Sequence, residues 1–240
     1  MVSILAGAIP VIAAAGDAAH ISDSTVKVLV ERELARRGLA KDEFKVAVDD
    51  RVVTLSGFVS TLNAKKRAGE AAAKAYGVSR VENDLAVRMV SDTEIIPAVR
   101  KSILTHPYYD VFDWIEAKVG DGIVTLSGSV REPWRRREFE ERVMNIAGVS
   151  KVENQIKVLP LSTYDDEIRI RAARTIYGSS TLGRYALGAN PPIHFIVENG
   201  RLTLKGIVMN TLDRQVAESL VRTSVLAFDV KNELQIESRY

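Results

Sequence analysis

The chain has 240 residues, of which 46% are hydrophobic and 27% charged, so it belongs to the globular rather than the disordered class. It contains no cysteine, which excludes disulfides, thiolate metal sites and cysteine catalysis. Lys and Arg number 33 against 31 Asp and Glu, and a net charge of +2 excludes a globally basic nucleic-acid-binding protein.

The N-terminal residues 1–21 precede the first predicted domain. Residues 4–12 are apolar, and Ala13 and Ala15 stand where a secretory signal has small residues before its cleavage site. No Lys or Arg precedes Lys27, so the basic start of such a signal is missing. We expect either an export signal whose true start lies upstream of Met1, or an apolar arm that packs on the first domain.

A helix start occurs three times along the chain. The segments are SDSTVKVLVEREL from Ser22, SDTEIIPAVRKSIL from Ser91 and STYDDEIRIRAARTIY from Ser162. A serine before apolar residues at helical spacing predicts a capped helix, and Ser91 with Glu94 matches a capping box. Pro97 is expected to limit how early the second helix becomes regular.

Each helix is followed by two β-branched runs around a tight turn. The three copies are FKVAV-DDR-VVTLSGFV, IEAKV-GDG-IVTLSGSV and HFIV-ENG-RLTLKGIV. Gly122 and Gly200 favour a two-residue hairpin turn because glycine adopts positive φ without strain. The first copy has Arg51 at this position, so its turn is expected to be altered or mildly strained.

A fixed spacing links the copies. A glycine near the end of the second strand is followed 26 residues later by an asparagine, and the pairs are Gly57 and Asn83, Gly128 and Asn154, and Gly206 and Asn232. Three equal intervals indicate tandem duplication. We expect these residues to be structural, with the glycine allowing a bulge or a close helix approach.

Apolar residues recur 11, 15 and 19 residues after each glycine, which predicts one buried helix face. They are Ala68, Ala72 and Tyr76; Phe139, Val143 and Ala147; and Ala217, Val221 and Val225. A last strand follows, and a right-handed crossover places it parallel to the second strand. The predicted fold is α+β, with three tandem αββαβ domains (22–90, 91–160 and 161–240), each a three-stranded mixed sheet with two helices.

The hairpin motif, together with YGVSRVENDL at 76–85 and AGVSKVENQI at 147–156, resembles the BON domain family. The third copy, LAFDVKNEL, lacks the glycine of this motif. The resemblance covers about residues 22–236 and implies a periplasmic or exported bacterial envelope protein. It further implies a module without catalytic residues or a cofactor, which binds anionic phospholipid or partner proteins and acts in osmotic or envelope stress protection.

Two alternatives to this function remain open at the sequence level. The chain could be a protein–protein adaptor, or it could bind a small ligand such as an ion without contacting a membrane, and a cytoplasmic location remains open as well. The histidines His20, His106 and His194 show no metal-ligand spacing, and no phosphate-binding loop occurs. We therefore expect no enzyme, no metal site and no nucleic-acid partner.

The candidate binding residues gather at two helix starts and in one aromatic segment. They are Trp134, Arg135, Arg136 and Arg137; Lys65, Lys66 and Arg67; and Tyr108 and Tyr109. Trp134 and the cations suit an anionic lipid surface, but the arginines also have Glu138, Glu140 and Glu141 within helical reach, which favours a solvated helix face.

The aromatic segment and an insertion complete the candidates. Tyr108, Tyr109, Phe112 and Trp114 are expected to seal a junction between domains, with an exposed contact surface as the alternative. Residues 178–193 form an insertion in the third copy, expected to be a surface loop in which Arg184 and Tyr185 are possible recognition residues.

Overall fold

A computed structural model describes residues 21–39, 44–188 and 190–237, so the expected export segment and His20 lie outside the described residues. Unit 1 contains α1 (Asp23–Arg36), β1 (Phe44–Asp49), β2 (Val52–Val59), α2 (Leu62–Lys74) and β3 (Arg80–Val87). Unit 2 contains α3 (Asp92–Leu104), β4 (Trp114–Gly120), β5 (Ile123–Val130), α4 (Pro133–Met144), β6 (Lys151–Asn154) and β7 (Lys157–Val158). Unit 3 contains α5 (Thr163–Tyr177), the 3₁₀ helix η1 (Gly183–Ala186), β8 (Ile193–Glu198), β9 (Arg201–Val208), α6 (Thr211–Ser224), β10 (Asp229–Asn232) and β11 (Gln235–Ile236).

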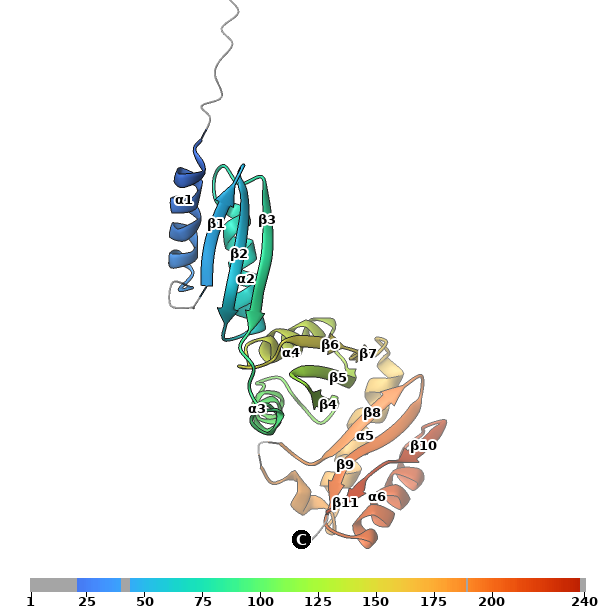
Figure 1. Cartoon of the computed structure of the whole chain (residues 1–240). Coiled ribbons are helices and arrows are strands. Elements are labelled where there is room, and N and C mark those ends of the chain that lie inside the picture. Colours follow the sequence, from blue (N-terminus) through green and yellow to red (C-terminus); the bar gives the residue numbers. More distant parts are fainter. Residues whose placement is uncertain (1–20, 40–43, 189, 238–240) are drawn as a thin grey trace, which may run out of the picture.

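The three units follow one another in space, with unit 2 between the other two (Figure 1). In each unit the first strand pairs antiparallel with the central second strand, and the last strand pairs parallel with the other edge of that strand. The predicted mixed αββαβ fold is therefore confirmed. A right-handed crossover through the second helix accounts for the parallel pairing.

The last strand differs between the copies. In unit 1 it is the single strand β3, whereas in units 2 and 3 it is divided into two short strands, which makes these sheets four-stranded. At the division, the side chain of Asn154 accepts a hydrogen bond from the backbone N–H of Ile156 at 3.2 Å, and Asn232 binds Leu234 in the same way. An asparagine that bonds its own backbone two residues on removes an N–H from the ladder.

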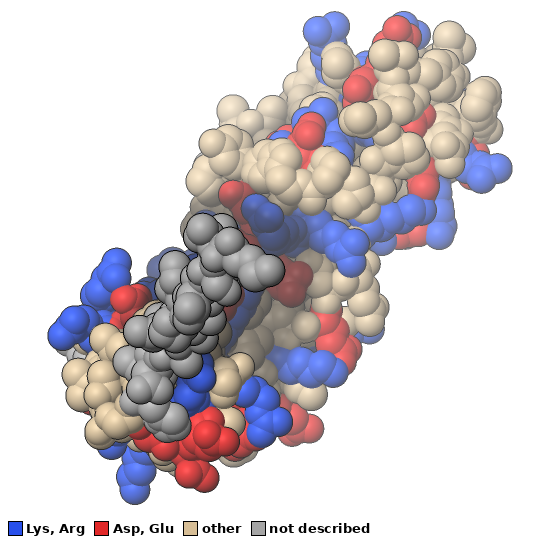
Figure 2. All heavy atoms as spheres, turned by 90° about the horizontal axis from the view of Figure 1, so that it is seen from above, with Lys and Arg blue, Asp and Glu red and all other residues tan. Residues whose placement is uncertain are grey.

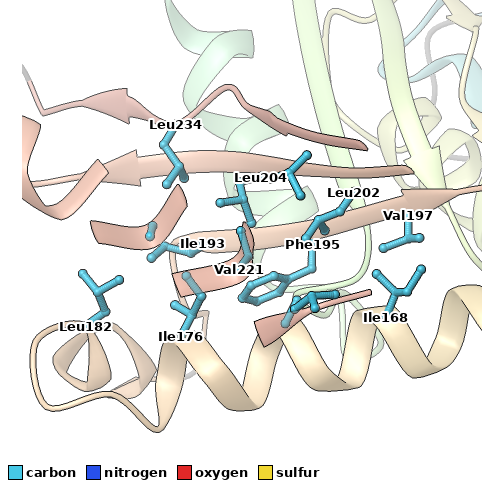
Figure 3. Close-up of a cluster of buried hydrophobic side chains, with 14 of the residues drawn as sticks. Ile168, Ile176, Leu182, Ile193, Phe195, Val197, Leu202, Leu204, Val221 and Leu234 are labelled. Atoms are coloured by element: carbon cyan, nitrogen blue, oxygen red, sulfur yellow. The ribbon is translucent and has the colours of Figure 1, made fainter. Parts of the chain in front are cut away.

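Each unit has its own apolar core between its sheet and its helices. Figure 3 shows this for unit 3, where Ile168 and Ile176 of α5 lie against Phe195 of β8. The unit 3 core also includes Val111 and Phe112, which come from the segment before β4 in unit 2. Units 2 and 3 therefore share apolar packing.

In units 1 and 2 the buried stripe of the second helix lies one turn earlier than the sequence pattern predicts, whereas in unit 3 Ala217, Val221 and Val225 are all buried as predicted. Tyr76 is 75% exposed and Ala147 is exposed as well, because α2 ends at Lys74 and α4 at Met144. The positions buried in all three units are 7, 11 and 15 residues after the glycine. They hold Ala64, Ala68 and Ala72; Arg135, Phe139 and Val143; and Asp213, Ala217 and Val221.

The serine caps form as predicted, since Ser22, Ser91 and Ser162 each accept a hydrogen bond from the first turn of a helix. Ser91 accepts it from Thr93, one residue earlier than a capping box requires. The expectation for Pro97 is wrong: α3 is helical from Asp92 onward with Pro97 inside it.

The hairpin turns are the same in all three copies. Their two central residues have positive φ, including Asp50 at 43° and Arg51 at 62°, so the first turn is strained but not altered in type. An aspartate from the first helix accepts hydrogen bonds from both N–H groups of each turn at 2.7–3.0 Å. These aspartates, Asp23, Asp92 and Asp165, join the first helix to the hairpin.

The repeated glycine meets a neighbouring strand and not a helix. Gly57, Gly128 and Gly206 have φ of 119°, 106° and 119°. A Cβ atom at Gly128 would collide with the carbonyl oxygen of Trp114, and one at Gly206 with that of Pro192. Glycine is thus required by both its backbone conformation and the close approach of the first strand.

A substitution of Asp165, the α5 aspartate that binds the third hairpin turn, tests this architecture. Asp165 is fully buried, so Asp165→Ala leaves the N–H groups of Asn199 and Gly200 without an acceptor and should reduce the free energy of unfolding by about 2 kcal/mol. Urea denaturation measures the change. Glu167→Ala, at an exposed position of the same helix, is the matched control and should change stability little. Equal effects of the two substitutions would contradict this role for Asp165.

Candidate functional site

An aromatic pair lies on the surface of unit 2 at the start of α4. Trp134 is 40% exposed and Tyr108 is 57% exposed. Their rings meet edge to face with centroids 5.2 Å apart. The guanidinium of Arg135, which is buried, lies over the Trp134 ring, 5.5 Å from its centroid. Trp134 is therefore held in place while much of its surface faces solvent.

Two more cations follow Arg135 in α4. Arg136 and Arg137 are exposed, and Arg137 forms only a 3.5 Å ion pair with Glu141, also exposed. Exposed helical pairs of this kind contribute little and leave the cation available. Arg136 donates a 3.3 Å hydrogen bond to the carbonyl oxygen of Asn154.

Helical spacing pairs Arg135 with Glu138, Arg136 with Glu140 and Arg137 with Glu141. The first two of these ion pairs are replaced by other contacts. Glu140 accepts a hydrogen bond from the side chain of Asn154 at 3.0 Å. Glu138 binds His106 Nε2 at 2.8 Å. The solvated-face alternative therefore holds for Arg137 but does not describe the surroundings of the other two arginines.

Arg135 is not a surface residue, which corrects its assignment to the lipid-facing group. It is 6% exposed, and its guanidinium pairs with the fully buried Asp113 and, at 3.2 Å, with Asp110. Burial raises the pKa of Asp113, while a hydrogen bond from the Arg131 N–H and the charge of Arg135 act to lower it. The pair fixes α4 to the segment that precedes β4.

The same aspartate connects unit 2 to unit 3. His194 Nδ1 lies 2.6 Å from the carbonyl oxygen of Asp113, and the N–H of Phe195 donates to the carbonyl of Val111 at 2.7 Å. The ring of His194 contacts Tyr109 and Trp114, with centroids 5.4 and 5.1 Å away. Tyr109 and Trp114 thus lie in the junction between units 2 and 3, whereas Tyr108 faces outward.

Ion pairs add to this junction from both sheets. Lys157 of unit 2 binds Glu198 of unit 3 at 2.6 Å, and Lys205 of unit 3 lies 3.7 Å from Glu116 of unit 2. Lys205 also lies over the ring of Trp114, 6.0 Å from its centroid. The two sheets therefore face each other across charged and aromatic contacts.

The basic residues of unit 1 occupy the corresponding helix start in α2. Lys66 and Arg67 are exposed and Lys65 is half-buried. Arg67 donates to the carbonyl oxygen of Arg37 at 2.5 Å. The position that holds Trp134 in unit 2 holds Asn63 here, and Asn63 contacts Asn145 of unit 2 at 2.7 Å. The start of α2 therefore offers cations without an aromatic side chain at the Trp134 position.

The repeated asparagines bind the second helix. The side-chain amides of Asn83, Asn154 and Asn232 donate to the carbonyl oxygens of Lys65, Arg136 and Arg214 at 2.8–2.9 Å. In units 2 and 3 a glutamate of the helix also accepts from the amide. Unit 1 has Gly69 at that position, where a Cβ would meet the Asn83 amide, and the Asn83 Oδ1 atom is buried without a partner.

The insertion in unit 3 is structural and not a free recognition loop. Tyr185 is 7% exposed, and its hydroxyl donates to Asp213 at 2.5 Å while accepting from the N–H of Met209. Arg184 forms an ion pair with the same carboxylate at 2.5 Å. Burial acts to raise the pKa of Asp213, but the bonds from Tyr185 and Arg184 hold that pKa below its usual value.

Other chemistry has little support in the described ranges. They contain no cluster of three or more His, Cys, Asp or Glu side chains suited to a metal ion. Within the same ranges, no helix combines the length and hydropathy needed to cross a bilayer. Figure 2 shows basic and acidic side chains interspersed over the face in view.

Comparison with known proteins assigns the family. The BON domain model matches residues 22–89, 91–160 and 182–238, and the chain belongs to the BON domain family. It is similar to Osmotically-inducible protein Y of Escherichia coli (strain K12), with 28% identity over 149 residues that cover 57% of this chain and 73% of that protein.

Solved structures give much weaker matches. The C-terminal domain of CdsD, a structural protein of the Type III secretion system of Chlamydia trachomatis, is 12% identical, with 91% of this chain and all of that chain covered at a TM-score of 0.26. The PrgH periplasmic domain is 14% identical, with 85% and 100% covered at a TM-score of 0.22. Both TM-scores are too low to indicate a shared overall arrangement.

Because of the buried ion pair, we expect the three neighbouring arginines to contribute unequally to the free energy of unfolding. Arg135→Ala leaves Asp113 buried without its main partner and should reduce the free energy of unfolding by about 3–5 kcal/mol. Arg137→Ala, two positions away and exposed, should change it by less than about 0.5 kcal/mol. Chemical denaturation of the full chain measures both changes, and a small effect of Arg135→Ala would show that the ion pair is dispensable.

The two buried histidines predict a pH dependence. Burial lowers the pKa of His106 and of His194 below 6.5 despite their hydrogen bonds. The unfolded chain therefore binds more protons just below pH 6.5, and the folded state should lose stability as the pH falls through that value. Thermal unfolding measured from about pH 7.5 to 5.5 should show a falling Tm.

His194→Asn provides the control for that measurement. The Asn amide can still donate to the Asp113 carbonyl, but it does not titrate in this range. The variant should have a flatter dependence of Tm on pH, whatever its absolute Tm. An unchanged slope in a variant that also carries His106→Asn would refute the assignment to these two side chains.

Proposed function

We propose that this chain is a non-enzymatic protein of the bacterial cell envelope that contacts anionic phospholipid surfaces through the start of α4. The contact surface consists of Tyr108, Trp134, Arg136 and Arg137, and we name it the α4 surface. The observation that carries the proposal is that Trp134 is 40% exposed yet contacts both the Tyr108 ring and the Arg135 guanidinium.

The physics of a lipid interface favours such a surface. Tyrosine and tryptophan rings suit the headgroup region because one part is apolar and the other can hydrogen-bond. Each basic side chain near an anionic membrane contributes about 1 kcal/mol. Arg136 and Arg137 are exposed and only weakly engaged with other groups, so they can bind phosphate.

Lys65, Lys66 and Arg67 are proposed as a secondary basic contact. They lie on the corresponding helix of unit 1, but without an aromatic residue to enter the interface. Their contribution is therefore electrostatic and should weaken as the salt concentration rises.

A role in the periplasm during osmotic or envelope stress is part of the proposal. It is supported by similarity to a protein named as osmotically inducible and by the signal-like pattern at residues 4–15. The adaptor alternative is favoured by another observation, the exposed apolar loop of unit 3, where Leu226 is 73% and Phe228 77% exposed. A protein partner could bind there.

Vesicle flotation tests the lipid proposal. The full chain should float with vesicles that contain anionic phospholipid and not with neutral phosphatidylcholine vesicles. Changing Arg136 and Arg137 to Glu should weaken binding at least tenfold, since two attractive charges become repulsive. Trp134→Ala should weaken it as well.

The matched control changes Arg171 and Arg174 to Glu. These residues are exposed on α5 of unit 3 and give the same change in net charge away from the α4 surface. The control should bind vesicles much as the unchanged chain does. Equal losses in the two double variants would mean that net charge, and not this surface, controls binding.

A further inference from the structure

A second recognition feature lies between units 2 and 3, away from the exposed α4 surface. A cavity of about 450 Å³ opens between α3 and β4, and the segment at residues 190–192 and β9 of unit 3 form its remaining wall. Its volume falls in the range of small-molecule binding sites. Most of the lining is aliphatic.

The cavity lies at a position where the residue type differs between the three copies. The residue paired with the central leucine of the second strand is Val46 in unit 1, Ala117 in unit 2 and Phe195 in unit 3. Phe195 is fully buried and fills the space between α5 and the sheet, as Figure 3 shows. Ala117 is too small to do so, and it is exposed to the cavity.

Unit 3 forms the opposite wall of the space next to Ala117. The side chain of Asn190 donates a 2.9 Å hydrogen bond to the carbonyl oxygen of Leu104, which attaches the segment to the end of α3. Pro191, Pro192 and Ile207 then supply apolar surface opposite α3 and β4. The cavity is therefore formed by two units together.

The polar groups at the cavity indicate the charge of its ligand. Arg100 of α3 lines it and is exposed, and no carboxylate of the described residues forms an ion pair with it. His194 lines the cavity too and is engaged through Nδ1 with Asp113. An apolar chamber with one unpaired cation is complementary to an apolar molecule that carries one negative charge.

We propose that the cavity between α3, β4 and unit 3 binds a single monomeric aliphatic carboxylate, with its chain against Ala117 and its carboxylate on Arg100. This function goes beyond contact with a lipid surface, because the ligand is taken up one molecule at a time. It also uses residues that the α4 surface does not contain.

Fluorescence of Trp114 provides a direct readout. The chain has two tryptophans, and Trp114 lines the cavity, so Trp134→Phe leaves Trp114 as the single fluorophore. Titration with 12-bromododecanoate, kept below its critical micelle concentration, should give saturable quenching with one ligand per chain. Quenching that is absent or does not saturate would overturn the proposal.

Two substitutions locate the ligand. Ala117→Phe introduces the residue of unit 3 and should weaken binding at least tenfold by filling the cavity. Circular dichroism checks that the variant folds, and Ala117→Val, the residue of unit 1, serves if it does not. A folded Ala117→Phe variant that binds with unchanged affinity would overturn the proposal.

The charge assignment has its own control. Arg100→Gln should weaken binding of the carboxylate about tenfold but leave binding of dodecanol unchanged. Lys101→Gln removes the same charge from a position that does not line the cavity and should have no effect. Equal effects of the two variants would refute the role of Arg100.

The two proposals fail separately. Ala117→Phe should leave vesicle flotation unchanged, and changing Arg136 and Arg137 to Glu should leave the quenching of Trp114 unchanged. Loss of both quenching and flotation in each variant would overturn the proposal that the cavity binds its ligand independently of the α4 surface.

Discussion

The buried ion pair between Arg135 and Asp113 connects most of the features that distinguish this chain. The guanidinium of Arg135 lies against the Trp134 ring, and Asp113 belongs to the segment whose backbone binds unit 3. Two charges taken out of water are tolerated only where each is well paired, so the surrounding elements have little freedom to move apart. The α4 surface and the cavity share no residue, and both adjoin elements that this ion pair holds together.

The same helix position has diverged in each copy. Seven residues after the repeated glycine, unit 1 has Ala64, unit 2 has Arg135 and unit 3 has Asp213, and all three are buried. The alanine packs in a local core, the arginine binds the segment before β4, and the aspartate binds the insertion through Arg184 and Tyr185. In units 2 and 3 this buried position thus binds an additional segment, whereas in unit 1 it only packs in the core.

Much of the fold follows from local sequence rules, while the site depends on contacts between distant segments. Serine caps, glycine turns and alternating strands were sufficient to predict three αββαβ units. The buried role of Arg135 was missed because its charge suggested exposure. Extending the apolar stripe of Phe139 and Val143 back by one helical turn reaches Arg135 and would have indicated burial. Its partner Asp113 carries no comparable signal, since their pairing depends on tertiary structure.

The junction between units 1 and 2 is different in kind from the one between units 2 and 3. Hydrogen bonds there join Asn63 to Asn145 and the backbone of Ser60 to that of Gly148, and in the described ranges the two apolar clusters share no side chain. Bending at this joint would break these hydrogen bonds without dividing either apolar cluster. Tension applied along the chain would consequently separate units 1 and 2 before either neighbouring core unfolds.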